Sequence, residues 1–96
     1  MEAVIGSRGI ISFDFSTLKL NNVISGGALG VDKLVYSYCI SNNIPIIEIL
    51  PNYGKHGTAA THIRNRQIVD SSDVVYAIWD MKSKGTKSVI EYAKKK

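Results

Sequence analysis

Small and polar residues follow each of four short apolar runs in this chain, and these residue types are suited to holding an anion. In chain order they are Gly6-Ser7-Arg8, Ser25-Gly26-Gly27, Asn52, and Asp80 with Ser83, Gly85 and Thr86. Glycine lets a backbone approach a phosphate closely, and arginine binds phosphate through a planar fork of N–H donors. If the apolar runs are parallel strands, all four loops lie at the edge of the sheet where ligands bind. The pattern predicts one phosphate-binding site built from several loops.

The segment from Ser25 to Asp32 reads SGGALGVD and joins a predicted strand to a predicted helix. The start of a helix offers unpaired N–H groups and a positive dipole end to a phosphate. The alternative interpretation is a tight turn with Gly30 near the N-cap. The spacing matches neither G-x-G-x-x-G nor the P-loop pattern, so it does not support the usual dinucleotide or NTPase sites.

A second loop, Lys82-Ser83-Lys84-Gly85-Thr86, also lies between a predicted strand and a predicted helix. Thr86 is expected to cap that helix and to reach an anion. Two helix N-termini and two lysines at one edge would suit a ligand with two phosphates. A solvated loop whose lysines only maintain solubility is the alternative.

A third polar group lies in the predicted helix from about Thr58 to Ser71. Arg64, Asn65 and Ile68 share one face of this helix, which predicts contacts with phosphate or base. The alternative is an ordinary exposed face. His62 could carry a proton, but a lone surface histidine usually has no such role.

Other candidates are single residues beside these loops. Asp80 could accept hydrogen bonds from ribose hydroxyls, and Tyr53 could stack on a base. Trp79 is expected in the core. Lys55 adds to a basic group that includes Arg64.

Apolar periodicity predicts an α/β domain spanning residues 1–96. The predicted strands are 3–5, 23–24, 45–50 and 74–79, with 45–50 of the buried type. The predicted helices are 12–20 (poorly formed), 31–41, 58–71 and 87–95, and residues 52–57 form a polar loop. Cys39 shares the apolar face of the second helix and is expected in the core. This order predicts a minimal Rossmann-like three-layer fold with a mostly parallel sheet of about four strands.

Composition limits the partners and the cellular location that we expect for this protein. The 96 residues are 45% hydrophobic and 21% charged, with a net charge of +4, which favours anionic partners. We find no apolar run long enough to span a membrane and no secretion signal, so we expect a cytoplasmic protein. A single cysteine and no Cys/His cluster predict neither a disulfide nor a metal site. The small core favours a homo-oligomer.

Taken together, the ordered motifs resemble the SLOG superfamily, and most closely its YspA-like branch. They are Val4-Ile5-Gly6-Ser7-Arg8, the segment from Ser25 to Asp32, Pro51 with Tyr53-Gly54-Lys55 and Gly57, Ile63-Arg64-Asn65, and Trp79-Asp80 with Ser83-Lys84-Gly85-Thr86. The chain is similar, more distantly, to Lonely Guy phosphoribohydrolases and to DNA-processing protein A. The resemblance implies a Rossmann-like sheet and a pocket for nucleotides or nucleotide-derived signals such as ADP-ribose derivatives or cyclic nucleotides.

One departure from the relatives bears on catalysis. Lonely Guy enzymes carry P-G-G-x-G-T-x-x-E, and Val89 stands where that pattern has its catalytic glutamate. We therefore expect capture of a signalling nucleotide with no catalytic residue and no cofactor. Some SLOG domains sense such signals in antiphage defence, and a free-standing copy could act as a phage-type sponge. The alternatives are N-glycosidic hydrolysis of nucleoside monophosphates and, because the chain is basic, single-stranded nucleic-acid binding.

Overall fold

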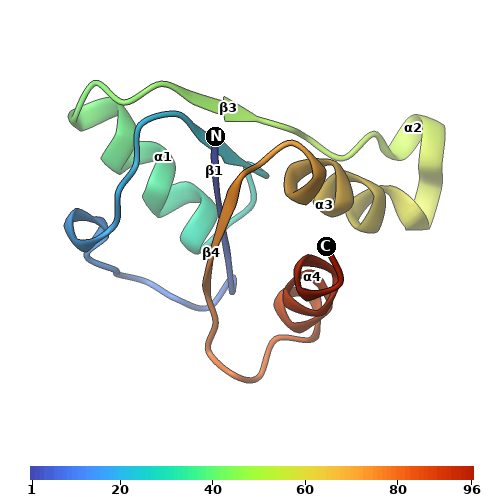
Figure 1. The fold of residues 1–96 in the computed structure, drawn as a ribbon. Helices are drawn as coiled ribbons and strands as arrows, with labels where there is room; N and C mark the ends of the chain where they lie inside the picture. The colour runs from blue at the N-terminus through green and yellow to red at the C-terminus, as the bar shows by residue number, and fades with distance from the viewer.

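The computed structural model describes all residues, 1–96, and is built on a four-stranded parallel sheet (Figure 1). Its strands are β1 (Glu2–Gly6), β2 (Val23–Ser25), β3 (Ile46–Glu48) and β4 (Val74–Ile78), in the order β3-β2-β1-β4. Ala3 of β1 pairs with Ile24 of β2 on one side and with Val75 of β4 on the other. The central strand β1 therefore fixes the register of both neighbours.

Helices cover both faces of this sheet. Helix α1 (Val31–Ser41) lies on one face, and α3 (Ala60–Asp70) and α4 (Lys84–Lys94) lie on the other (Figure 1). A short helix α2 (Tyr53–His56) and two 3₁₀ turns, η1 (Phe15–Thr17) and η2 (Gly57–Ala59), complete the chain. The structure confirms the predicted Rossmann-like α/β fold. None of its helices has the length and apolar character needed to span a bilayer.

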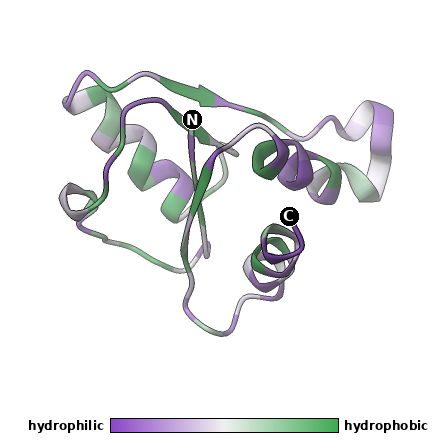
Figure 2. Ribbon diagram, viewed as in Figure 1, coloured by the Kyte–Doolittle hydropathy of each residue, from purple (hydrophilic) through white to green (hydrophobic).

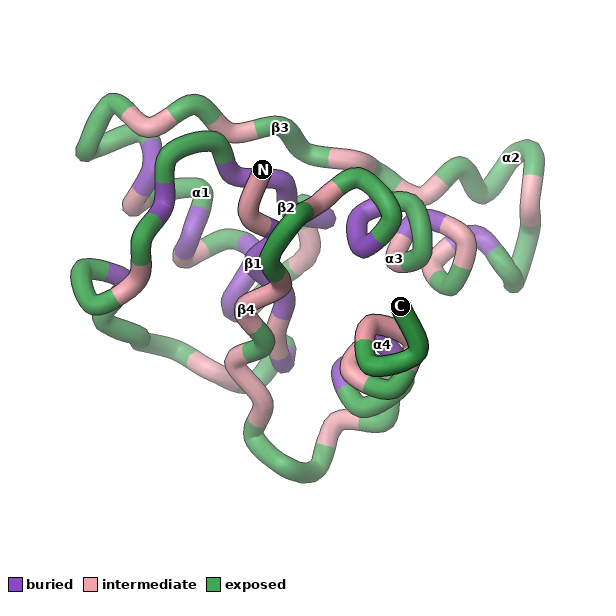
Figure 3. Tube along the Cα trace, in the orientation of Figure 1, coloured by how far each residue is buried: buried purple, intermediate pink, exposed green.

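Successive side chains of β1 point to opposite faces of the sheet, and this divides the core into two layers. Val4 faces α1 and packs with Val31, Val35 and Cys39, whereas Ala3 and Ile5 face α3 and α4. Figure 3 shows the buried residues concentrated along β1, β2 and the inner faces of the helices. Cys39 is fully buried, as its position on the helix predicted.

Helix α4 begins three residues before the predicted start. Ser83 is its N-cap, and the Oγ of Ser83 accepts a hydrogen bond from the N–H of Thr86 at 3.3 Å. Capping by a serine hydroxyl satisfies one of the free N–H groups at a helix start. The expectation that Thr86 caps this helix was therefore wrong, because Ser83 occupies the capping position.

Four other expectations fail for reasons of tertiary context. Residues 12–20 form only the single turn η1, and residues 52–57 contain α2. The predicted buried strand at 45–50 is the short edge strand β3, where Ile47 stays 54% exposed because only one strand flanks it. Trp79 lies outside both core clusters, and its Nε1 donates to the carbonyl of Ser83 at 3.0 Å.

Candidate functional site

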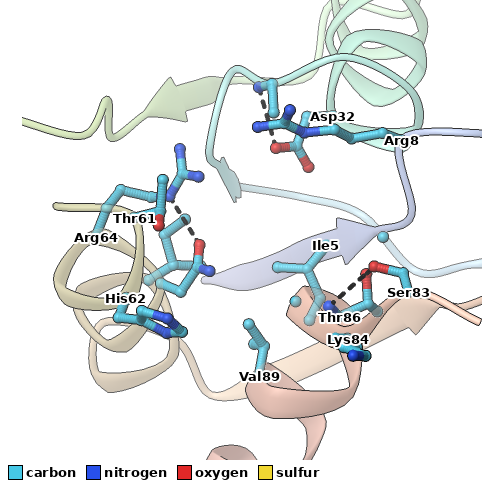
Figure 4. Close-up of a pocket in the computed structure, with 15 residues that line it drawn as sticks. Ile5, Arg8, Asp32, Thr61, His62, Arg64, Ser83, Lys84, Thr86 and Val89 are labelled. Carbon is cyan, nitrogen blue, oxygen red and sulfur yellow. Dashed lines mark hydrogen bonds between the residues drawn. The ribbon is translucent and has the colours of Figure 1, made fainter. Parts of the chain in front are cut away.

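A cavity of about 420 Å³ opens near the carboxyl end of β1, between α3 and the N-terminus of α4 (Figure 4). Fifteen residues line it, and they come from the end of β1, the loop after β2, the first turn of α1, α3 and the start of α4. Eight of them were singled out from the sequence: Arg8, Asp32, Arg64, Asn65, Ser83, Lys84, Gly85 and Thr86. The fold thus brings together side chains that are up to 78 positions apart, from Arg8 to Thr86.

Apolar side chains form one wall of the cavity. Ile5 from β1, Ile68 from α3 and Val89 from α4 belong to the core layer beneath it. Asp32 is the one acidic side chain of the lining, whereas Arg8, Arg64 and Lys84 are basic. The cavity is therefore cationic, with a hydrophobic side against which a sugar or a base could pack.

Arg64 is the most constrained of these basic groups. It is only 7% exposed, and its Nη1 donates to the carbonyl oxygens of Gly26 at 2.5 Å and Ile49 at 3.4 Å. Its Nε donates to Oδ1 of Asn65 at 2.7 Å. These bonds attach α3 to the loops that follow β2 and β3. Burial lowers the pKa of Arg64, while Asp32 and the hydroxyl of Tyr53 act in the opposite direction.

Asp32 lies in the first turn of α1 and supports the glycine loop after β2. Its Oδ2 accepts a hydrogen bond from the N–H of Ala28 at 3.1 Å. Burial raises the pKa of Asp32, whereas the Ala28 N–H and the charge of Arg64 oppose the rise. The Oγ of Ser25 is fully buried without a hydrogen bond of good geometry, although it is near enough to Asp32 to lower its pKa slightly.

Gly26 occupies the space between these two charged groups. A Cβ at this position would lie 2.7 Å from Nη1 of Arg64 and 2.9 Å from Oδ2 of Asp32. Such distances are shorter than van der Waals contact, so a side chain here would push the arginine and the carboxylate apart. The glycine is required because the Asp32 and Arg64 side chains converge on its Cα.

We expect the Asp32→Asn variant to change the pH dependence of stability. Because its pKa is raised, Asp32 in the folded protein keeps its proton to a higher pH than Asp32 in the unfolded chain, whose pKa is the ordinary 3.8. Wild-type stability should therefore fall relative to Asp32→Asn as pH rises through this window. Urea unfolding of both proteins between about pH 4 and pH 7 measures the difference. If wild-type stability instead rose relative to Asp32→Asn with increasing pH, the charge of Arg64 would outweigh the effect of burial on the pKa of Asp32.

Ser7 and Asp80 do not line the cavity but position the N-terminus of α4. The buried Oγ of Ser7 accepts a hydrogen bond from the N–H of Asp80 at 3.1 Å and lies 3.4 Å from Oγ1 of Thr86. Oδ1 of Asp80 accepts from the N–H groups of Lys82 and Ser83, each at 2.8 Å. These two N–H groups hold the pKa of Asp80 below its usual value.

The remaining predicted residues lie behind or beside the cavity. Ser25 and Gly26 are buried at the end of β2, and Gly27 turns with a φ of +69° toward Leu50. Asn52, Tyr53 and Lys55 are exposed at α2, where Oδ1 of Asn52 accepts from the N–H of Lys55. A ligand confined to the cavity would not touch these residues.

The sequence analysis overlooked part of the lining. Gly6 and Ala28, which belong to the predicted loops, line it beside the ends of β1 and β2, whereas Thr61 of α3 was not predicted as a contact. His62, interpreted as a surface residue, is exposed but lies at the edge of the cavity. Thr61 could have been found, because it precedes Asn65 by four positions and Ile68 by seven on one helical face.

Comparison with family models, curated proteins and solved structures returned no significant match for this chain. The resemblance to the SLOG superfamily therefore stays a prediction from the motifs. No three His, Cys, Asp or Glu side chains gather as they would in a metal site.

Proposed function

We propose that this chain binds a phosphate-bearing, nucleotide-derived small molecule in the cavity beside α4 and holds it without turnover. The observation that carries the proposal is the convergence of Arg8, Arg64 and Lys84, from three separate segments, on a cavity with one carboxylate. Basic side chains with so few acidic neighbours favour an anionic ligand. The resemblance to SLOG domains narrows the proposal to an ADP-ribose-like or cyclic-nucleotide signal, and includes sequestration by a phage-type sponge.

Phosphate groups would bind along the polar side of the cavity. The first backbone N–H groups of a helix have no partner within it, and in α4 they belong to Lys84 and Gly85. Both residues line the cavity, so a phosphate there meets free N–H donors and the positive end of the helix dipole. Arg8 and the buried Arg64 supply a second cationic region for a second phosphate.

The sugar and base would lie against the apolar wall. Thr61 and Asn65 offer a hydroxyl and an amide next to Ile68 on the same face of α3. Hydrogen-bonding groups beside an apolar surface suit a ribose or a base edge. The cavity volume of about 420 Å³ lies in the range of small-molecule sites and favours a nucleotide over an extended polynucleotide.

We expect Arg8→Ala and Lys84→Ala each to weaken nucleotide binding. Both side chains are exposed, so their removal should leave the fold intact. Losing a charge-assisted contact should cost about 1.5–3 kcal/mol, or roughly ten- to a hundredfold in Kd. Calorimetry with AMP, ADP-ribose and a cyclic dinucleotide as probes measures the effect. Lys33→Ala, which removes an exposed lysine of α1, is the matched control. Unchanged affinity in both cavity variants would contradict the proposed site.

Hydrolysis of an N-glycosidic bond is the second candidate, because the cavity contains Asp32 with a raised pKa. A carboxyl group that keeps its proton above its ordinary pKa is suited to general acid catalysis. Chromatography of the nucleotide recovered after incubation distinguishes the two functions. If the protein only captures the nucleotide, chromatography should recover it intact. Release of free base that stops in Asp32→Asn would establish the hydrolase instead. Tighter binding of single-stranded DNA, with steep salt dependence, would favour a nucleic-acid function.

A further inference from the structure

The outer edge of β4 is exposed and free of the features that usually protect an edge strand. β4 is the last strand of the sheet, and its five residues, VVYAI, are all apolar or aromatic. None of them is buried (Figure 3). Val74 is 45% exposed. An edge strand of this kind presents unpaired backbone N–H and C=O groups to another strand.

The opposite edge of the sheet is different. β3 has only three residues, Pro45 directly precedes it, and Glu48 is its last residue. Short length, proline and charge all discourage pairing at an edge. The two edges are therefore not equivalent, and β4 is the one open to pairing.

A groove of about 510 Å³ runs beside β4 on the face that carries α3 and α4. Its apolar residues are Val69, Val75, Ala77, Ile90 and Ala93, and its charged residues are Asp70, Asp73, Lys94 and Lys96. Figure 2 shows the hydrophobic, green stretch of β4 and the hydrophilic, purple C-terminal end of α4. Asp70 pairs with Lys96, and Asp73 pairs with the terminal amino group of Met1. The chain carries a net charge of +4. The two acidic and two basic side chains of this groove nevertheless balance each other, so the groove would not repel the same groove of a second copy.

We propose that β4 pairs antiparallel with β4 of a second copy of this chain, so that a homodimer forms around one continuous sheet. A two-fold axis at Tyr76 would set Val74 opposite Ile78 of the partner subunit, and Val75 opposite Ala77 of the partner subunit. Every pair on both faces is then apolar or aromatic, and no charge is buried. Apolar cross-strand pairs stabilise a sheet, whereas opposed like charges weaken it.

The small core of this protein also favours a homodimer. Only 20 of its 96 residues are buried, which is a small core for independent stability. Pairing across a two-fold axis buries the same patch from both copies, as in most homodimers. The groove residues Val75 and Ala77 would be covered as the sheet extends.

Sedimentation equilibrium of the wild type and of Ala77→Lys tests this interface. The lysine would be placed twice in each dimer, opposite Val75, and should raise the dimer Kd about a hundredfold or more. Ala77 is exposed in the monomer, so the variant should fold normally. The matched control is Ile40→Lys, on the outer face of α1, where Ile40 is 57% exposed and the dimer Kd should not change. A wild type that stays monomeric, or a dimer that persists in Ala77→Lys, overturns the proposal.

Cross-linking tests the position of the axis. Directly opposed residues of antiparallel strands have Cα atoms about 4.5–5.5 Å apart, which permits a disulfide. Tyr76→Cys should therefore form a covalent dimer under mild oxidation, and Ile40→Cys should not; the native Cys39 is buried in both. Equal cross-linking of the two variants would contradict the two-fold at Tyr76. Ala77→Lys should bind nucleotide as the wild type does, because Ala77 lies outside the cavity lining. The dimer and the proposed function can therefore fail independently.

Discussion

Arg64→Ala should reduce the free energy of unfolding by about 3–5 kcal/mol and abolish nucleotide binding. The buried guanidinium donates to Gly26, Ile49 and Asn65, and it lies near Asp32. Its loss leaves the Gly26 carbonyl without this donor and the buried Asp32 carboxylate without the positive charge that opposes the rise in its pKa. Urea unfolding measures the loss of stability, and calorimetry measures binding.

Arg66→Ala is the control for this substitution. Arg66 belongs to the same helix but is exposed, and its guanidinium lies 5.3 Å from the ring centroid of Tyr92. An exposed cation–π contact contributes only about 0.5–1 kcal/mol. Similar destabilisation by Arg64→Ala and Arg66→Ala would show that the buried contacts of Arg64 do not hold the site together.

Gly30→Ala should destabilise the protein by more than about 4 kcal/mol, or prevent folding. Gly30 has a φ of +76°, and a Cβ there would lie 2.5 Å from Cα of Arg8 and 2.6 Å from its carbonyl oxygen. It would also collide with the carbonyl oxygen of Ser7. All three are backbone atoms, which cannot move aside as the end of a flexible side chain can. The measurement is urea unfolding, with yield of folded protein as a second readout.

Two other glycines separate the clash from the backbone strain. Gly57 has a φ of +56° and a ψ of −129°, close to those of Gly30, but nothing lies within 4 Å of its Cβ position, so Gly57→Ala carries the backbone strain alone and should cost about 1–3 kcal/mol. Gly9 has open space and an ordinary φ, so Gly9→Ala should have little effect. If Gly30→Ala destabilised the protein no more than Gly57→Ala does, the close approach of the end of β1 to α1 would not be the reason that position 30 requires glycine.

Local patterns in the sequence were sufficient to predict the parallel α/β architecture and much of the cavity. Apolar spacing identified α1 with Val35 and Cys39 inward, and the polar ends of the runs identified Arg8 and Thr86. These features follow from the periodicity of helices and strands and from the rule that parallel strands end at one edge. They require no knowledge of which strands are neighbours.

Only the tertiary structure decided which strands form the edges and what each polar residue does. The composition of 45–50 resembles a central strand, yet the order β3-β2-β1-β4 exposes Ile47 at one edge and Val74 at the other. Likewise, Ser7 and Asp80 support α4 instead of lining the cavity, because their partners are backbone groups beside them in space. Strand order and such partners depend on contacts between residues far apart in the chain, and local periodicity carries no information about these contacts.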